Sequence, residues 1–434
     1  MTEVVNQSEA TSSPSPTLVE AFWVWFRIGV LSFGGPAAQI ALVHREVVEA
    51  RGWLKEQQYL NALSFCMLLP GPEAMQLVTY AGWRLHGVVG GLVAGLCFVV
   101  PGAIVIAVLA TIYAFYGDVP LVSALFLGVK AAVIIIVIEA LIKVSKRALV
   151  QREHWLIALL AFIAIFFLAV PFPLIIGSAA LVGFLRATNN NDDSTLPRPT
   201  YSNSSPAATT LIWLTIWWIP LFALMALDDG QLIFEIGLFF SKLAVVTFGG
   251  AYAVLAYLGQ DVVGHYGWLE AGEMMDGLGL AETTPGPLIL VNEFVGFIAG
   301  FRSGGLGMGL LGAFVTLWAT FVPCFLWIFV GAPFIDWLGA QAKLRNALAA
   351  ITAAVVGVML NLSIWFALNV YFGTVEANAV GPLRLWTPSL ASFDWRVLVL
   401  SVVCAVLLLA LRWSVVRVLC LSALGGLALS YIAP

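Results

Sequence analysis

Long apolar runs separated by short polar breaks recur along nearly the whole chain. Only 10% of the residues are charged and the mean hydropathy is +0.98, whereas soluble domains carry about 25% charged residues. Such a chain cannot hide its apolar surface in a water-soluble core, so we expect helices that span a bilayer about 30 Å thick. The runs are too long for membrane β-strands and lack their alternation. The expected helices lie near residues 18–43, 58–83, 87–116, 121–142, 155–170, 174–186, 210–227, 235–258, 273–300, 304–330, 346–371, 395–411 and 413–433.

Two polar segments mark the expected domain boundaries. The N-terminal segment has no Lys or Arg, so it lacks the cationic start of a signal peptide, and the first apolar run should remain as a membrane helix. Residues 187–206 are rich in Asn, Ser, Pro and Asp, which predicts a flexible linker. The expected organisation is a disordered tail (1–17), a first repeat (18–186), a linker (187–209), a connecting membrane helix (210–234) and a second repeat (235–434).

An internal repeat relates the two halves. A shift of 215 residues superposes residues 20–72 on 235–287 without a gap, with 16 identities in 53 positions. Further along, Pro101 matches Pro323 at a shift of 222, so the second half carries a short insertion. Repeated halves with interrupted hydrophobic segments are typical of secondary transporters. The predicted fold is therefore an all-α polytopic membrane protein with about 12–13 transmembrane helices in two homologous, inverted repeats with interrupted helices.

The basic residues constrain the topology. The positive-inside rule places three clusters in the cytoplasm, namely Lys143, Lys146, Arg147 and Arg152, then Lys343 and Arg345, and finally Arg412 and Arg417. Six helices, one extra helix and six more satisfy this rule, with the N-terminus inside and the halves antiparallel. A fourth basic group, Arg45, Arg51 and Lys55, would then lie outside. A re-entrant segment around residues 70–72 would remove this conflict, and the first half would then begin outside.

An acid, a base and a glycine pair recur in the first expected helix of each half. Glu20 and Arg27 lie two turns apart and so share one helical face, and Glu235 and Lys242 repeat them. An ionisable residue in a spanning helix costs at least about 2.5 kcal/mol, so it has a partner or a function, unless each base merely snorkels or pairs with its own Glu. A glycine break exposes N–H groups that, beside a cation, suit a divalent oxyanion. The predicted anion-binding residues here are Arg27, Ser32, Gly34 and Gly35, and in the second half Lys242, Thr247, Gly249 and Gly250.

A Pro-Gly-Pro motif also occurs once in each half. It removes two backbone donors, so the helix must break there; it either lines a cavity or forms a tight turn outside the bilayer. The neighbouring acids Glu73 and Glu282 are candidates for proton coupling, although Glu73 also suits the start of a half-helix. The other predicted site residues are Pro70, Gly71, Pro72 and Gln76 in the first half and Thr283, Thr284, Pro285, Gly286, Pro287 and Asn292 in the second, with Glu293 as a third coupling candidate.

Two other polar features have structural interpretations. Lys130 and Glu139 lie nine residues apart in one expected helix and should be neutralised through neighbours. The five cysteines form no CxxC pair and lie in apolar runs, which predicts buried thiols and no metal site.

With these motifs the chain resembles the chromate ion transporter family, in its long-chain form with two fused domains. The resemblance covers nearly the whole chain apart from the tail and the linker. Glu293 departs from it, because relatives are expected to carry glutamine there, and a carboxylate would repel a dianion unless protonated. The segments that carry the resemblance are FRIGVLSFGGPAAQI (26–40), HREVVEARGWL (44–54), LLPGPEAMQLVTYAGW (68–83), FFSKLAVVTFGGAYAVL (239–255), HYGWL (265–269) and GLGLAETTPGPLILVNEFVGF (277–297).

The resemblance implies a multi-pass protein of the inner (plasma) membrane that exports chromate, driven by the proton gradient, with sulfate as an analogue. Its partners would be the chromate or sulfate dianion, protons and the lipid bilayer, without nucleic acid or cofactor, and a homodimer stays an open alternative. Uptake or exchange of sulfate or another oxyanion is the main alternative function, because chromate and sulfate are tetrahedral dianions of similar size. An intramembrane enzyme is a remote alternative, since the sequence shows no cofactor motif, metal-ligand spacing or nucleophile with its base, so we expect no enzyme.

Overall fold

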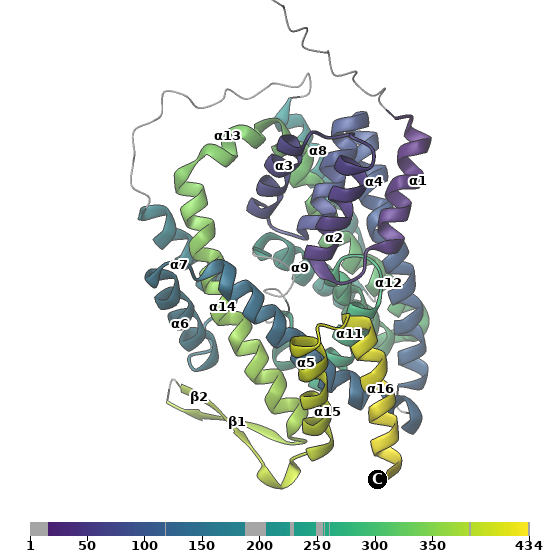
Figure 1. The fold of residues 1–434 in the computed structure, drawn as a ribbon, viewed down its shortest axis with the longest axis vertical. Helices are drawn as coiled ribbons and strands as arrows, with labels where there is room; N and C mark the ends of the chain where they lie inside the picture. The colour runs from purple at the N-terminus through teal and green to yellow at the C-terminus, as the bar shows by residue number, and fades with distance from the viewer. Residues whose placement is uncertain are drawn as a thin grey trace, which may run out of the picture.

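The computed structural model describes residues 16–117, 119–186, 205–225, 230–248, 255, 257–259, 261–381 and 383–432 (Figure 1). This part of the chain is helical apart from one β-hairpin, which confirms the predicted helical polytopic fold. The expected tail (1–17) and linker (187–209) lie almost entirely outside the described residues. The elements are α1 (Leu18–Leu31), α2 (Gly35–His44), α3 (Glu56–Leu68), α4 (Glu73–Tyr116), α5 (Pro120–Ala148), α6 (Arg152–Phe166), α7 (Phe172–Leu185), α8 (Pro206–Leu224), α9 (Gly230–Val246), α11 (Ala271–Thr283), α12 (Val291–Gly331), α13 (Ile335–Ala340), α14 (Ala342–Tyr371), β1 (Val375–Val380), β2 (Leu383–Pro388), α15 (Trp395–Ala405) and α16 (Val415–Ile432).

The glycine and proline motifs interrupt the first helices of each half, as predicted. The expected helix over 18–43 is two helices, because α1 ends before Ser32 and Gly34, with φ of +88°, opens α2. Likewise α3 ends at Leu68, and Pro72 precedes the first residue of α4. The interruptions shorten the spans: α3 has 13 residues, about 20 Å of helix, too little to cross a bilayer.

The longest helices, α4 and α12, each contain a sharp reversal. Non-helical backbone occurs at His86 and Gly87 in α4 and at Gly304 and Gly305 in α12. The segments on either side pack antiparallel, since a Cβ on Gly82 would lie 2.3 Å from the Gly90 oxygen. Each long helix is therefore a half-helix joined to a full span.

The two Pro-Gly-Pro segments are the tips of re-entrant hairpins. In the first half, Gly71 lies against Cys324 of α12, while Phe65 of α3 lies against Gly331, seven residues further along α12. The first turns of α4 run from the tip back toward the end of the molecule at which α3 begins, because Gly91 contacts both Phe329 of α12 and the Thr79 backbone. In the second half, Tyr113 of α4 contacts both limbs of the hairpin, α11 and the start of α12.

The halves are inverted with respect to each other. Along the full spans of α4 and α12, Gly91 meets Phe329 and Gly95 meets Phe325, so the two spans run antiparallel. The first hairpin accordingly occupies the upper part of Figure 1 and α11, from the second hairpin, lies below it. The predicted inversion of the repeats is thereby confirmed.

One topological expectation is wrong. A re-entrant first motif was expected to move the start of the chain to the opposite side from Arg45, Arg51 and Lys55. Instead α1 and α2 also form a hairpin: Ser32, between them, accepts from the Gly286 N–H of the second tip, whereas His44 at the end of α2 lies 2.8 Å from Glu56 at the start of α3. Pro16 accepts a hydrogen bond from His86 at the outer end of the first hairpin. The start of α1 and this basic group therefore lie at the same end of the molecule.

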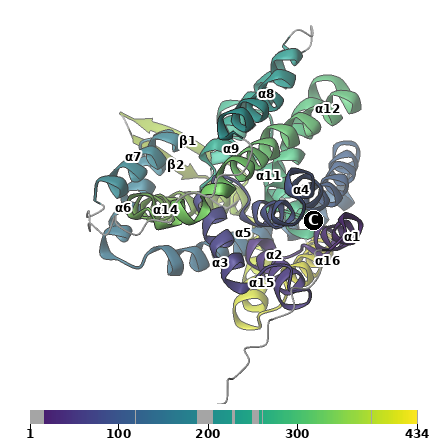
Figure 2. The same ribbon diagram turned by 90° about the horizontal axis from the view of Figure 1, so that it is seen from above.

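Six helices of the described chain are long and apolar enough to cross a membrane, fewer than the expected runs, because several of those runs are half-helices. Two of the six, α4 and α12, pack together, while α6 and α7 flank α14 on the other side of α5 (Figure 2). The connecting helix α8 begins at Pro206, four residues earlier than expected. The hairpin of β1 and β2, which the sequence did not predict, joins α14 to α15. Four of the cysteines are buried as expected, but Cys420 is exposed.

Candidate functional site

The two hairpin tips exchange partners between the repeats. The Gly71 N–H of the first tip donates to the Thr247 carbonyl of the second repeat, at 2.8 Å. The Gly286 N–H of the second tip donates to the Ser32 carbonyl of the first repeat, at 2.9 Å. Each Pro-Gly-Pro tip is thus bonded to the glycine-motif segment of the opposite repeat. Two predicted features that lie about 40 residues apart in each half meet across the centre of the molecule.

Both tips require glycine for geometric reasons. Gly71 and Gly286 have φ of +121° and +94°, values that only glycine adopts without strain. A Cβ on Gly71 would lie 2.9 Å from the Cys324 sulfur, and one on Gly286 would lie 2.9 Å from Leu290. Side-chain amides complete the tips: Gln39 donates to the Gly286 carbonyl at 2.6 Å, and Gln76 donates to the Pro70 carbonyl at 2.7 Å.

A cavity of about 250 Å³ opens beside the start of α2, between α5 and the two hairpins. It brings together residues from both repeats that the sequence analysis had selected separately, among them Gly34, Gly35, Glu73 and Glu282. Glu282 is buried and Glu73 is half-buried. The cavity is therefore the place where the predicted glycine break and the predicted coupling acids converge.

Helix α5 supplies the basic side chains of this cavity. Glu139, Lys143 and Arg147 recur every four residues and so form one stripe on the helix, which faces the cavity. Lys143 lies 2.6 Å from Glu139, and its side chain is 71% exposed, so it can reach a ligand from the mouth. Arg147 contacts the Met67 sulfur next to the first tip. The lining thus holds two cations and three carboxyl groups.

The sequence of the chain matches one family over nearly all of both repeats. A profile described as chromate transporter matches residues 19–184 and again residues 234–427. The chain belongs to the chromate transporter family. The transporter is 31% identical over 347 residues to a probable chromate transport protein of Synechococcus elongatus, covering 79% of this chain and 83% of the relative. It is 30% identical over 353 residues to a chromate transport protein of Cupriavidus metallidurans, covering 80% and 82%. No solved structure matches it.

The transporter is a multi-pass membrane protein whose relatives are named as transport proteins. A protein of Pseudomonas aeruginosa, named as a chromate transport protein, is 31% identical over 354 residues and is covered over 80% of each chain. The match thus extends over most of this chain and over most of each of these relatives.

The two basic residues predicted in the first helices lie apart from the cavity. Arg27 of α1 and Lys242 of α9 are both exposed, and neither belongs to the cavity lining. Glu20 caps α1, where its carboxylate accepts from the Thr17 N–H at 2.8 Å, and Glu235 is exposed on α9. Gly249 and Gly250 lie outside the described residues. The doubled acid–base pattern therefore does not converge on the same space as the tips.

The predicted hydroxyl and amide groups mainly stabilise backbone near the tips. The buried Ser32 and Thr247 hydroxyls donate to carbonyls one turn earlier in their helices, and Thr283 and Thr284 do the same in α11. Asn292 donates to Thr320 at 3.4 Å. One oxygen each of Gln76 and Asn292 is buried without a partner among the described residues. Pro70, Pro72, Pro285 and Pro287 are buried beside the two glycines.

Glu293 lies in a different cavity. Its 2% exposed side chain borders an apolar groove of about 560 Å³ between α4, α8 and α12, in which it is the one charged residue of the described lining. The third coupling candidate is thus separated from Glu73 and Glu282.

Lys143 and Arg147 line the cavity, whereas the sequence prediction used them only to assign topology. It also expected Lys130 and Glu139 to be neutralised through neighbours, and the structure names them: Lys130 pairs with Asp276, and Glu139 pairs with Lys143. The four-residue spacing of Glu139, Lys143 and Arg147 was the signal that could have found the stripe, since a helix buried on its other faces must turn such a stripe toward water or a ligand.

Proposed function

We propose that this transporter exports chromate across the plasma membrane, driven by the proton gradient, and that sulfate binds in the same cavity. The observation that carries this proposal is the cavity at the crossing of the two inverted repeats, where Lys143 and Arg147 face the glycine segment and both coupling acids. A site between inverted repeats, near broken helices, is where secondary transporters hold their substrates. The flexible cationic side chains of Lys143 and Arg147 suit a tetrahedral dianion, whether chromate or sulfate.

Anion binding and proton binding are linked in this cavity by charge. With Glu73, Glu139 and Glu282 ionised, three negative charges outweigh the positive charges of Lys143 and Arg147. A dianion entering such a cavity is repelled, whereas protonation of Glu73 and Glu282 leaves a net positive lining. Protonation of Glu73 and Glu282 therefore admits the dianion to the cavity. These protons must return to the cytoplasm within the cycle, because protons that left with chromate would cancel the voltage that drives its export. This control of entry supports a role in coupling for the two acids.

The membrane voltage favours export over uptake. Each elementary charge that crosses the membrane changes the free energy by about 2.3 kcal/mol per 100 mV. A dianion that leaves a negatively charged interior therefore gains about 5 kcal/mol per 100 mV before any proton is counted. Uptake of sulfate through the same cavity would have to offset this term with at least two accompanying protons. The proton-motive force thus acts on chromate directly through its electrical part.

The test is labelled chromate flux in inverted membrane vesicles that carry the transporter. Energised vesicles should accumulate chromate, and an uncoupler should abolish the accumulation. Clamping the voltage with valinomycin and potassium should remove most of it, while dissipating only the pH difference should remove less. Accumulation that survives the uncoupler, or sulfate uptake with no chromate flux, would contradict the proposal.

Substitution of the basic residues locates the anion site. We expect Arg147→Ala to raise the KM for chromate at least about tenfold, because a charge-assisted contact to a dianion is lost. Lys143→Ala should raise the KM slightly less. Arg27 and Lys242, which the sequence predicts as anion-binding residues, are tested in the same assay through Arg27→Ala and Lys242→Ala. Flux lost in those two variants and unchanged in Arg147→Ala would move the site to α1 and α9. Static light scattering of the purified protein, in turn, tests the open alternative of a homodimer.

A further inference from the structure

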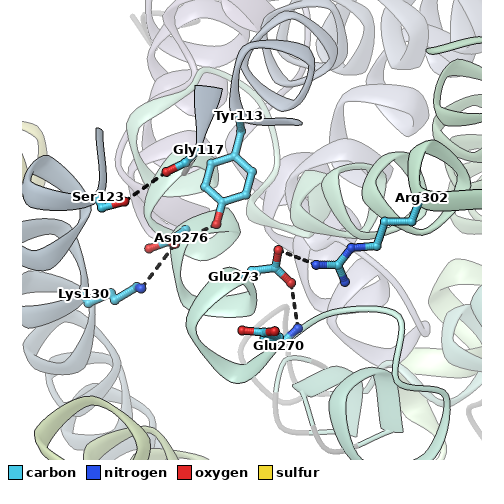
Figure 3. Close-up of polar contacts among 8 residues, drawn as sticks. All are labelled: Tyr113, Gly117, Ser123, Lys130, Glu270, Glu273, Asp276 and Arg302. Carbon is cyan, nitrogen blue, oxygen red and sulfur yellow. Dashed lines mark hydrogen bonds and ion pairs between the residues drawn. The ribbon is translucent and has the colours of Figure 1, made fainter. Parts of the chain in front are cut away.

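A second polar cluster lies at the base of the second hairpin, away from the chromate cavity (Figure 3). Asp276 of α11 points toward Tyr113 of α4 and Lys130 of α5, so the cluster joins one repeat to the other. One carboxylate oxygen accepts from the Tyr113 hydroxyl at 2.9 Å and lies 3.4 Å from the Lys130 ammonium. The other oxygen is buried and has no partner among the described residues. The Asp276 side chain is only 5% exposed, whereas that of Lys130 is 27% exposed.

The ionised form of Asp276 depends on Lys130. A carboxylate removed from water loses several kcal/mol of hydration, which a close cation and full hydrogen bonding must offset. Here the cation touches one oxygen and nothing satisfies the other, so a proton on the carboxyl group removes both the desolvation cost and the attraction to Lys130. Since Lys130 is partly exposed, water can reach the pair. The carboxyl group can therefore bind a proton, and only its ionised form attracts Lys130.

The helices that meet at this pair approach each other closely. A Cβ on Gly272 would lie 3.1 Å from the Lys130 ammonium, and a Cβ on Gly279 would lie 2.1 Å from Val129 of α5. Asp276 lies between these two glycines on α11. The surface of α11 thus lies close against α5 at both glycines, and the ion pair of Asp276 with Lys130 is a polar tie between them.

The same two helices carry the walls of the chromate cavity. Glu282 follows Asp276 on α11 by six residues, about 9 Å along the helix, just before the second tip. Lys130 precedes Glu139, Lys143 and Arg147 on α5. Movement of α11 away from α5 at its base would therefore shift Glu282 and the second tip relative to the basic stripe.

The other charged groups around Asp276 are already engaged. Glu273, one turn earlier on α11, is bound at 2.6 Å by Arg302 of α12 and caps the helix start through the Glu270 N–H. Within the described chain, no hydrogen bond or ion pair joins Asp276 to α12, α14 or α16, although these helices also pack against α11. The groups that set its charge are thus Tyr113 of α4, Lys130 of α5 and, by repulsion, Glu273.

We infer that Asp276 is a proton-operated latch: ionised, it holds the second hairpin against α5 through Lys130 and Tyr113, and protonated, it frees the hairpin to move during the transport cycle. This inference rests on the proposed transport function and adds a proton-binding residue outside the cavity. The latch belongs to the second repeat alone, because the matching residue of the first hairpin is Asn61, whose amide carries no titrating charge.

The test is the pH profile of chromate flux at saturating chromate, where the charge of the cavity acids no longer limits the rate, measured with equal pH on both faces and an imposed voltage. In the native transporter the initial rate should rise about tenfold for each unit by which the pH falls, as Asp276 becomes protonated. Asp276→Asn should flatten that profile to less than about twofold, and Asp276→Glu should restore a slope. Because Asp276→Asn alone leaves the partly exposed Lys130 without its partner, the double variant Asp276→Asn/Lys130→Gln is measured beside it and should be equally flat. The matched control Glu273→Gln removes an acid from the same helix and should keep the native slope.

The outcomes separate the latch from the transport function. Chromate flux with the native slope in the double variant would overturn the latch while leaving the transport proposal intact. A slope lost equally in Glu273→Gln would overturn it too, since any acid of α11 would then serve. No voltage-driven chromate flux in the native protein would instead refute the transport proposal itself. Flat pH profiles in Asp276→Asn and in Asp276→Asn/Lys130→Gln, together with a steep profile in Glu273→Gln, would establish the latch.

Discussion

The two re-entrant hairpins share one backbone design but differ in charge. Both begin with a 13-residue half-helix, both turn at Pro-Gly-Pro, and both tips are bonded to the opposite repeat. The second hairpin carries Glu270, Glu273, Asp276 and Glu282, whereas the matching residues of the first are Lys55, Gln58, Asn61 and Met67. The first hairpin has its acids elsewhere, at Glu56 and Glu73.

This difference shows that the packing of inverted repeats constrains the backbone of the tips but not the charges of the limbs. The tips must stay alike, because each closes a hydrogen bond that only a backbone free of side-chain obstruction can reach. The limbs need only fit the bilayer and their neighbours, so one can lose charges that the other uses. We interpret the first hairpin as one that responds to protons only at Glu73, beside its tip, and the second as one that responds to them both beside its tip, at Glu282, and at its base, at Asp276.

The largest effect is expected at the tips, where the hairpins should behave as equals. Gly71→Ala and Gly286→Ala each place a Cβ below 3.0 Å from a neighbour and force a backbone that only glycine adopts. Strain of about 1–3 kcal/mol per site should lower the melting temperature, and displacement of the tip should reduce chromate flux at least about tenfold. Vesicle flux and thermal unfolding of the purified protein measure both effects.

The controls for the tips are Gly52→Ala and Gly267→Ala. These glycines match each other between the repeats and have φ of +62°, but a Cβ would meet no atom within 4 Å. They should lose some stability and keep most of the flux. If one tip variant transported at the native rate while the other failed, the tips would not be equivalent, and the comparison drawn above would be broken.

Most of this framework can be predicted from the sequence because it depends on local chemistry. Proline and glycine in Pro70–Pro72 and Pro285–Pro287 force breaks wherever they occur, and the 215-residue shift reveals the repeat without any structure. What the sequence could not show was that each tip pairs with the opposite repeat. The shift aligns each motif with its own counterpart, whereas the contacts exchange them, and only the fold reveals which backbone groups come within bonding distance.

The site was harder to predict for the same reason. The doubled pairs of Glu20 with Arg27 and Glu235 with Lys242 gave a strong pattern, yet symmetry alone does not say which way a helix face points. Arg147 gave no repeated pattern, because α5 belongs to the first repeat and the described part of the lining has no basic stripe from the second. The positive-inside rule already explained its charge. A comparison of the two repeats cannot detect a site residue that only one repeat contains.

A smaller effect is expected from neutralising the cavity acids. Glu282→Gln removes a negative charge from beside a dianion, so the KM for chromate should fall about tenfold, the equivalent of about 1.4 kcal/mol for charges several Å apart in a polar medium. Glu73→Gln should lower KM less, because Glu73 is half-buried rather than buried and its charge is better screened. Initial rates at an imposed voltage measure both. Glu153→Gln, an exposed acid of α6 outside the cavity, serves as the control and should leave KM unchanged. A KM that rises in both variants would mean that these carboxylates attract rather than repel the substrate complex.

The smallest effect is expected from giving the first hairpin the acid of the second. Asn61 is exposed on α3 and accepts from the Gln57 amide at 2.8 Å, so Asn61→Asp should change the free energy of unfolding by less than about 0.5 kcal/mol. In the Asp276→Asn background it should leave the pH profile flat, because the new carboxylate is exposed and hydrated and does not rebuild the buried pair with Lys130. Recovery of the native slope would mean that an acid on either hairpin suffices. The burial of Asp276 beside Lys130 would then be incidental, and the charge difference between the hairpins would carry no function.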